Sequence, residues 1–189
     1  FEGKRRMAQA IAGIKELSQY VDSLVVIPND RLCQMPDTPR ITLQNAFEIA
    51  DGVLSQGTRS ISDLINVPSF INLDFADVSS VMKDAGYAHM GVGVGTGKDK
   101  AEDAARNAIS SPLLESSIAG ARGVLISVVA SSDVSLADVE IASTMISAEA
   151  APDANVIWGV NFDDEMDDSM RVTIIATGFD KKNDTAAPV

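Results

Sequence analysis

From residue 71 to residue 179 the chain alternates between helical and strand patterns, and this order constrains the fold more than any other feature. It predicts an α/β chain in the broad sense, with an α+β domain built on a mixed sheet of about four strands covered by helices. We expect the last two strands to form an antiparallel hairpin joined by the acidic loop DDEMDD. The predicted helices are the segment from INLDFADV to Ala85, then 99–109 and 135–150, and the predicted strands are 87–95, 123–130, 155–162 and 171–179.

A different order precedes this region: a helix at 3–21, a short strand at 23–29 and a helical pattern at about 42–66. The last of these is longer than most globular helices, so it could form a spine between two layers or two domains. A single strand cannot make a sheet, so we expect the first part to need partners that the chain lacks. The chain also enters a helix almost at once, which is typical of a segment cut from a larger fold.

The charge and composition exclude several classes of function. The formal net charge is −12, which disfavours binding to nucleic acid or to anionic lipid, because both need clustered Lys and Arg. Cys33 is the only cysteine, so no internal disulfide can form, and this fits a reducing cytoplasm. No apolar run approaches the roughly 20 residues of a membrane span. Only 5% of the residues are aromatic, so we expect an aliphatic core.

The glycine-rich segment GVGVGTGK (91–98) resembles a phosphate-binding loop but lacks its spacing. A P-loop needs glycine where Val92 stands and Ser or Thr where Asp99 stands. The dinucleotide pattern GxGxxG fails as well, because its last glycine would fall on Thr96 or Lys98. A glycine-rich strand packed closely against a helix explains the segment better.

Other residues that could carry chemistry stand alone in the sequence. His89 is the only histidine, and neither it nor Cys33 has the further ligands that a zinc site needs. The loop DDEMDD lacks the central glycine and the spacing of an EF-hand, so a solvated loop is the simpler interpretation, with weak cation binding as an alternative. We therefore predict no metal site in the chain.

Two carboxylates, Asp74 and Asp77, stand three residues apart at the start of a predicted helix. This spacing is typical of a capping box, in which each side chain accepts a hydrogen bond from the backbone of the other residue. The same pair could instead orient a water molecule for attack on a phosphate. Spacing does not choose between the two interpretations.

Several long segments together resemble the FtsZ family, the bacterial tubulin homologues of cell division. The resemblance covers about residues 1–180 and implies the closing part of a GTP-binding domain at 1–71, including the long central helix, a C-terminal domain at 72–180 and the start of a disordered linker at 181–189. The glycine-rich half that cradles GTP in this family is absent from the chain. The segments that carry the resemblance are FEGKRRMAQAIAGI, VDSLVVIPNDRL, SISDLI, INLDFADV, SSPLLE and RVTIIATGF.

The resemblance implies roles for two groups of residues. Asn72, Asp74 and Asp77 match the catalytic loop that the family inserts into the GTP site of the next subunit of a head-to-tail filament. The residues expected to contact GTP or GDP are Glu2 and Arg6 near the ribose and phosphates, Asn29 near the sugar, Phe47 stacked on guanine and Asp51 at the base edge. An ordinary core position on a helix is the alternative for Phe47.

The resemblance further implies a cytoplasmic protein at the mid-cell division site, where it builds the Z ring with other division proteins and without direct membrane contact. The cofactor would be GTP or GDP, with Mg²⁺ possible beside GTP. For the chain alone we expect neither GTP binding nor hydrolysis. A non-enzymatic assembly module is the alternative function.

Overall fold

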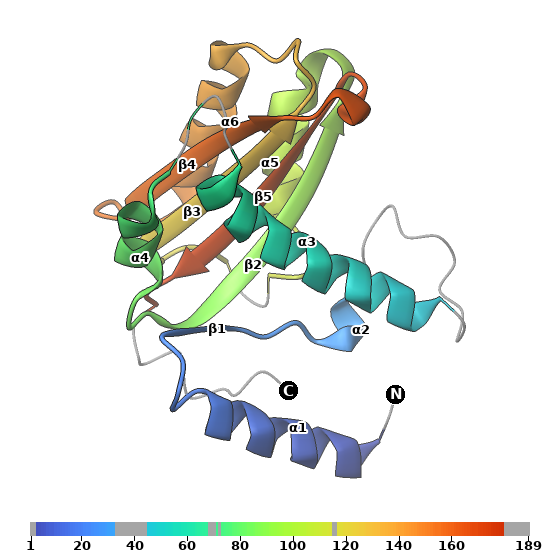
Figure 1. Ribbon diagram of the computed structural model, residues 1–189, viewed down its shortest axis with the longest axis vertical. Helices are drawn as coiled ribbons and strands as arrows, with labels where there is room; N and C mark the ends of the chain where they lie inside the picture. Colours follow the sequence, from blue (N-terminus) through green and yellow to red (C-terminus); the bar gives the residue numbers. More distant parts are fainter. Residues whose placement is uncertain (1–2, 33–44, 68–70, 72, 115–116, 180–189) are drawn as a thin grey trace.

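The computed structural model describes residues 3–32, 45–67, 71, 73–114 and 117–179 (Figure 1). Its helices are α1 (Lys4–Leu17), α2 (Asn29–Leu32), α3 (Ala46–Asn66), α4 (Phe75–Met82), α5 (Lys100–Ile109) and α6 (Leu136–Glu149), with short 3-10 turns η1 (Gly97–Asp99) and η2 (Asp164–Met166). Its strands are β1 (Ser23–Val25), β2 (Gly86–Thr96), β3 (Gly123–Ala130), β4 (Asn155–Phe162) and β5 (Ser169–Thr177). The predicted element types are confirmed for these ranges, except that the short helix α2 was not predicted and begins at Asn29, inside the predicted strand 23–29.

The strands form one mixed sheet in the order β1-β2-β5-β3-β4. The predicted hairpin of the last two strands is wrong, because β5 lies between β2 and β3 and is antiparallel to both, while β4 pairs in parallel with β3. Burial explains this strand order. The last six residues of β5 are all buried, whereas β4 has exposed residues at both ends. A strand that is buried on both faces needs a neighbour on each side, so β5 takes a central place and β4 an edge.

The sheet has five strands rather than the predicted four because β1 joins it. Ser23, Leu24 and Val25 pair in parallel with the first residues of β2. The backbone N–H of Gly86 also donates to the carbonyl of Asp22 at 2.9 Å. The expectation that the first strand needs partners outside the chain is therefore wrong for this edge of β1.

Helices cover both faces of the sheet, with α3 and α4 in front of it and α5 and α6 behind it in Figure 1. The layer between the sheet and α5 and α6 is built largely from Ala, Val and Ile, as the scarcity of aromatic residues predicts. The layer beneath α3 and α4 contains Leu64, Val78 and Val81 together with Met90 of β2. This second apolar layer fixes the long helix α3 and the short helix α4 on the same side of the sheet.

The glycines of β2 lie against the backbone of α5, as the sequence predicts for a glycine-rich strand. A Cβ atom on Gly93 would stand 2.2 Å from the carbonyl oxygen of Ala104, and one on Gly95 would stand 2.1 Å from that of Lys100. The facing helix positions Ala104, Ala105 and Ala108 are fully buried. The segment GVGVG is therefore a close-packed strand, and the backbone of α5 fills the space beside its glycines.

Several boundaries differ from the predicted ones. The first helix ends at Leu17 rather than at residue 21, and the first strand ends at Val25 rather than at residue 29. The helix α4 ends at Met82 rather than Ala85, because Lys83 is extended and Asp84 has a positive φ of 54°. Gly86 accordingly begins β2 instead of ending the helix. The predicted start of the long helix at 42 lies outside the described residues, whose first residue in this region is Asn45.

Candidate functional site

The start of α4 holds Asp74 and Asp77 in a complete capping box. The Asp77 N–H donates to Asp74 Oδ1 at 2.8 Å, and the Asp74 N–H donates to Asp77 Oδ2 at 3.2 Å. The cap interpretation is therefore confirmed, and it leaves the catalytic interpretation open because both residues are exposed. Each carboxylate uses one oxygen in the cap, so its other oxygen can accept a hydrogen bond from water.

The helix beneath these acids is firmly anchored. Val78 and Val81 are 5% and 4% exposed, and Leu73, directly before the cap, is 9% exposed. The N–H of Leu73 donates to the carbonyl of Leu64 at 3.4 Å, which ties the loop to the last turns of α3. The two carboxylates are thus presented to solvent from a rigid support. Asn72, predicted to act with them, lies outside the described residues.

The residues predicted to contact a nucleotide lie at the other end of α3. Phe47 and Asp51 are four positions apart in its first turns and so share one helix face. Phe47 is 60% exposed, so it is not a core residue of the described structure. Asn29 begins α2, which contacts α3, and Arg6 lies in the first turn of α1. Glu2 lies outside the described residues.

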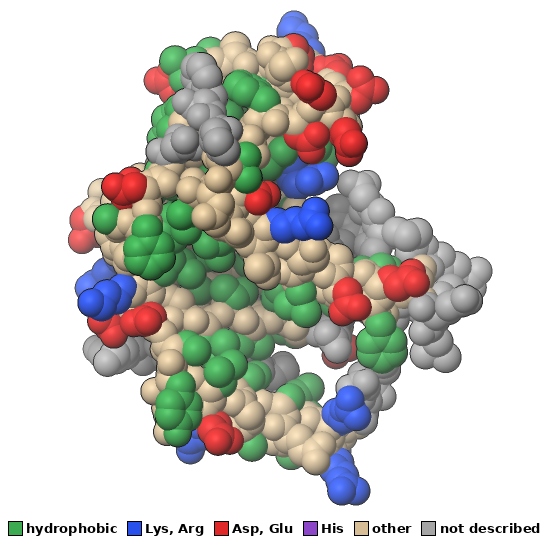
Figure 2. Space-filling view, viewed as in Figure 1, with side chains coloured by type: hydrophobic (Ala, Val, Ile, Leu, Met, Phe, Trp, Pro, Cys, Tyr) green, Lys and Arg blue, Asp and Glu red, His purple; other side chains and the backbone are tan. Residues whose placement is uncertain are grey.

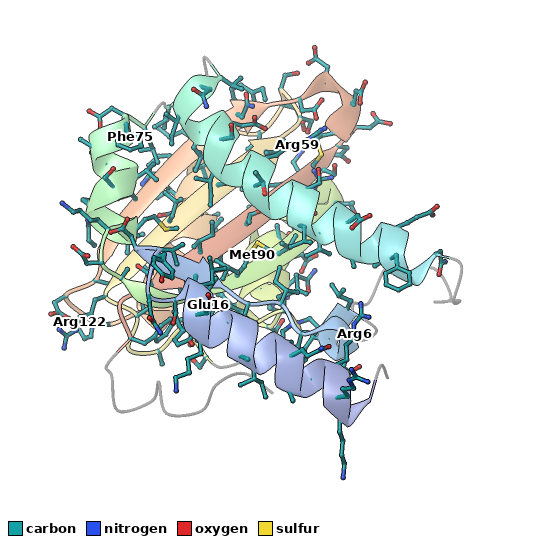
Figure 3. The ribbon with its side chains drawn as sticks, turned by 60° about the horizontal axis from the view of Figure 1, so that its bottom comes forward. Arg6, Glu16, Arg59, Phe75, Met90 and Arg122 are labelled. Carbon is teal, nitrogen blue, oxygen red and sulfur yellow. The ribbon has the colours of Figure 1, made fainter. Side chains whose placement is uncertain are left out.

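The two predicted groups are far apart in the structure. The helix α3 has 21 residues and is about 30 Å long at 1.5 Å per residue. Its first turns carry Phe47 and Asp51, whereas α4 with its two acids follows its last turn. Figure 3 shows Arg6 and Phe75 on opposite sides of the molecule. The two predicted groups of one chain therefore cannot contact the same ligand.

Charge is also distributed unevenly along the molecule. Helix α1 carries four basic side chains, Lys4, Arg5, Arg6 and Lys15, and one acidic side chain, in a chain of net charge −12. In Figure 2, basic side chains gather at the N-terminal end of α1 and acidic side chains gather around η2 at the opposite end of the molecule. The nucleotide-side residue Arg6 belongs to the basic end.

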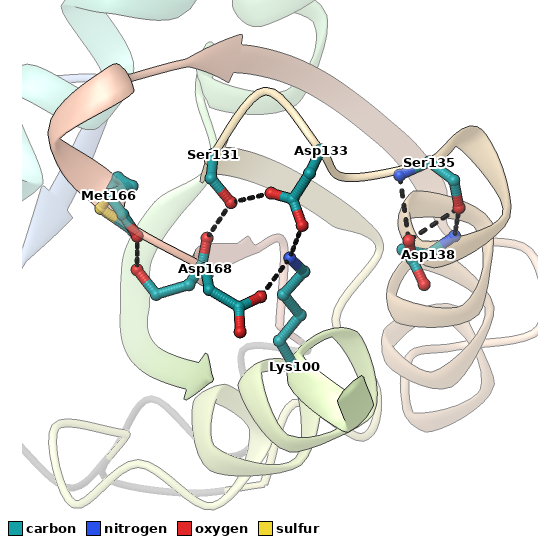
Figure 4. Close-up of polar contacts among 8 residues, drawn as sticks. Lys100, Ser131, Asp133, Ser135, Asp138, Met166 and Asp168 are labelled. Carbon is teal, nitrogen blue, oxygen red and sulfur yellow. Dashed lines mark hydrogen bonds and ion pairs between the residues drawn. The ribbon is translucent and has the colours of Figure 1, made fainter. Parts of the chain in front are cut away.

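Lys100 is buried and pairs with two exposed carboxylates in a charged cluster that the sequence did not predict (Figure 4). Its Nζ donates to Asp133 Oδ2 at 2.5 Å and to Asp168 Oδ1 at 2.9 Å, and Ser131 donates to the second oxygen of Asp133. The Lys100 ammonium lowers the pKa of Asp133, and hydrogen bonding to Asp133, opposed by burial, raises the pKa of Lys100. The cluster joins three loops at one end of the sheet, and each of its charges is already paired.

Two further candidates from the sequence, His89 and the acidic loop, have structural roles. The ring of His89 in β2 packs edge-on against Phe179, with centroids 4.8 Å apart. The acidic loop forms η2 and carries the chain from the edge strand β4 to the central strand β5. Within the ranges that the structure describes, no three His, Cys, Asp or Glu side chains are grouped as a metal ion would require. The same ranges contain no helix with the length and apolar character to cross a membrane.

The fold defines the class to which the chain is similar. TubZ of Bacillus thuringiensis serovar israelensis, solved as GDP-form protofilaments, matches with a TM-score of 0.66 at 12% identity over 89% of this chain and 49% of that one. CetZ2 of Haloferax volcanii, a GTPγS-bound protofilament, matches with a TM-score of 0.63 at 14% identity over 88% and 49%. At these identities the likeness shows a shared fold, that of the tubulin-like proteins.

Closer matches identify the family. The model of the FtsZ family C-terminal domain matches residues 86–180. The FtsZ dimer of M. jannaschii, solved empty, is 38% identical with a TM-score of 0.89, over 94% of this chain and 51% of that one. Its W319Y mutant is 37% identical with a TM-score of 0.88, over 94% and 53%. The chain belongs to the FtsZ family, and it spans about half the length of these relatives.

Proposed function

We propose that the chain is the C-terminal part of a filament-forming GTPase and supplies catalytic acids to the GTP site of the next subunit. The observation that carries this proposal is the separation, along α3, of the residues predicted to contact the nucleotide from the two acids at the start of α4. The acids follow the last turn of α3, about 20–30 Å of helix from Phe47 and Asp51, so they can meet a nucleotide held there only on another copy. A contact between two different ends of the same molecule repeats from copy to copy and yields an open filament.

In the proposed contact, Phe47 stacks on guanine, Asp51 accepts from its N–H groups, and Arg6, Glu2 and Asn29 contact the phosphate and sugar side. The carboxylates of Asp74 and Asp77 accept hydrogen bonds from a water molecule, with Asn72 beside them, and hold that water in line with the γ-phosphorus. Water attack then breaks the bond from the γ-phosphorus to the bridging oxygen.

Mixed-subunit hydrolysis tests this proposal in the complete protein. The variant Asp74→Asn keeps an oxygen for the cap and loses the charge, so it should bind GTP normally and hydrolyse it about a hundredfold more slowly or worse. The variant Asp51→Ala should lose GTP binding. A mixture of the two should regain hydrolysis, because the intact acids of one variant meet the intact nucleotide end of the other.

The matched control is Asp138→Asn, which makes the same change in the capping box of α6 and should leave hydrolysis unchanged. Loss of GTP binding in Asp74→Asn would show that the acid lies in the pocket of its own subunit. Absence of recovery in the mixture would contradict a site shared between subunits.

A second candidate function concerns the chain by itself. The glycines of GVGVG are packed against α5, so this segment offers no phosphate cradle. We therefore propose that the isolated chain is an assembly module that does not turn over GTP. Calorimetry of the purified chain should detect no micromolar binding of GTP, and such binding would overturn this candidate.

The cellular role follows from the same proposal. A protein with this activity would act in the cytoplasm at the mid-cell division site, as part of the Z ring and with other division proteins. A fluorescent fusion of the complete protein should form a band at mid-cell, and a uniform distribution throughout division would contradict this role.

A further inference from the structure

A row of residues on the α3 side of the sheet is left partly uncovered between α3 and η2. Across β2, β5, β3 and β4 the strand register aligns Val94, Arg171, Val129 and Asn161. The neighbouring row lies beneath α3, because the Ser60 hydroxyl donates to Thr173 Oγ1 at 3.2 Å and this bond is buried. The four aligned residues, here called the Arg171 strip, are all at least partly exposed, and Val94 is 37% exposed.

One flank of α3 borders the Arg171 strip. The opposite flank, which carries Ile61 and Ile65, packs into the apolar layer beneath α3 and α4. Helical periodicity therefore turns Gln56 and Arg59, three positions apart, toward the strip. Figure 3 shows Arg59 near the middle of α3, and in Figure 2 basic side chains lie between η2 and α3.

The strip and this flank hold three donors that have no acceptor among the described residues. The side-chain nitrogen of Gln56 is buried and has no hydrogen-bond partner there. Arg59 and Arg171 form no ion pair within the same ranges, although the acidic turn η2 directly precedes β5. Two guanidinium groups and an amide N–H match the acceptors of a carboxylate, so this surface favours an acidic group from outside.

The edge of β2 beside the strip is also open. Within the described ranges β1 pairs only with residues 86–88, so the rest of this edge has no neighbouring strand. The N–H of Gly97 donates to Asp168 on the β5 side, and alternation along the strand turns the backbone of Val94 to the open side. The Val94 carbonyl accepts there from the side chain of Asn107 at 2.9 Å, whereas the Val94 N–H meets no described acceptor.

We propose that the Arg171 strip and the open edge of β2 form a docking site for an extended peptide segment that carries a carboxylate side chain. The peptide backbone pairs with the edge at Val94, as in other proteins that bind an added strand. Side chains of an added strand alternate between its two faces, so every second one lies on the α3 side. A glutamate or aspartate at such a position accepts hydrogen bonds from Arg171 and Arg59. The site uses neither nucleotide nor the acids of α4, so it does not depend on the proposed function.

Fluorescence anisotropy of the complete protein with a labelled peptide tests the site. The probe is a short peptide that alternates valine and glutamate, and its matched counterpart has glutamine in place of glutamate. The glutamate peptide should bind about tenfold more tightly, because charge-assisted hydrogen bonds are stronger than neutral ones. Arg171→Gln should remove about tenfold of this affinity, and Arg59→Gln should remove a smaller factor because Arg59 is exposed.

The matched control is Arg106→Gln, which removes an exposed arginine from α5 on the other face of the sheet and should leave the affinity unchanged. Equal affinity for the two peptides would overturn the site, and so would an equal defect in Arg106→Gln and Arg171→Gln. Val94→Pro removes the edge N–H and should abolish binding of the glutamate peptide. Parent-like binding by a folded Val94→Pro variant would overturn pairing with the edge, and Arg171→Gln decides the proposal if Val94→Pro does not fold.

Discussion

Helices α5 and α1 are attached to the molecule in opposite ways. In α5, Ala104, Ala105 and Ala108 are fully buried, and the glycines of β2 approach the helix backbone directly. In α1 no residue is buried, and Met7 and Leu17 are each more than 40% exposed. The sheet with α5 and α6 thus has a complete core, whereas α1 is held by the chain that leads into the short strand β1.

This difference separates stability from function in the molecule. The closely packed face of the sheet carries none of the residues predicted to contact GTP or water. Within the described ranges, the side chains of five of these residues are exposed, on α1, α3 and the start of α4: Arg6, Phe47, Asp51, Asp74 and Asp77. Substitutions behind the sheet should therefore change the free energy of unfolding, and substitutions on the other elements should mainly change assembly and hydrolysis.

The largest expected effect on stability is that of Gly93→Ala. The added Cβ would lie 2.2 Å from the Ala104 oxygen and 2.2 Å from the Ala108 nitrogen, and both are backbone atoms that cannot turn away. Strand and helix must therefore separate, which should lower the free energy of unfolding by about 3 kcal/mol. Urea denaturation of the purified chain measures it, and a change below about 1 kcal/mol would show that the close contact is not needed.

Lys100→Met should have the next largest effect, because it removes the only cation among the described residues that pairs with Asp133 and Asp168. The folded pKa of Asp133 is lowered, so its contribution is present above the unfolded pKa and is lost as pH falls through the folded value. The pKa of Lys100 is raised, so its contribution is lost only as alkaline pH rises through that value. The stability difference from the parent should be constant from about pH 5 to pH 9 and shrink below about pH 4.

The control for this substitution is Lys98→Met, two residues earlier and exposed. It should leave the urea midpoint unchanged at every pH. A Lys100→Met variant whose deficit does not shrink in acid would show that packing of the lysine chain, and not its ion pairs, stabilises the loops.

Ser135→Ala should cost about 1 kcal/mol, the usual effect of losing an N-cap. Ser135 Oγ accepts from the Asp138 N–H and donates to Asp138 Oδ2. The bonds that the Ser135 hydroxyl and the Ser135 N–H donate to Asp138 Oδ2 lower the pKa of Asp138. Chemical denaturation measures the loss, with Ser132→Ala in the preceding exposed turn as the control. Equal effects of the two substitutions would contradict a specific cap.

Gly13→Ala should have the smallest effect and the opposite sign. Gly13 lies inside α1, and a Cβ there would meet nothing within 4 Å. Alanine favours the helix by about 0.5–1 kcal/mol, so helicity measured by circular dichroism should rise slightly. A loss of helicity would show that α1 packs more closely than its exposure indicates, and the comparison with α5 would fail.

The sequence predicted local structure well and strand pairing poorly. The bounds of β3 and β4 and the capping box at Asp74 depend on neighbouring residues, and all three are confirmed. The predicted hairpin failed because adjacency in sequence was taken as adjacency in space. The nearly continuous apolar run of β5 was the available signal that it needs two neighbours.

Only those features of the candidate site that depend on residue types and their spacing could be predicted from the sequence. Helical periodicity places Phe47 and Asp51, four positions apart, on one helix face. It did not predict that Phe47 is exposed. Their assigned roles, like the domain boundaries near residue 71, came from resemblance and stay predictions. The Lys100 cluster was missed because its carboxylates lie 33 and 68 residues away along the chain.

The contact between β2 and α5 has a consequence for the thermodynamics of folding. Glycine and alanine have no side-chain rotamers to lose, so bringing these two elements together freezes no side-chain torsions. The same contact has no flexible side chain that could move to absorb an added atom. This part of the molecule therefore combines a low cost in side-chain entropy with a low tolerance of sequence change.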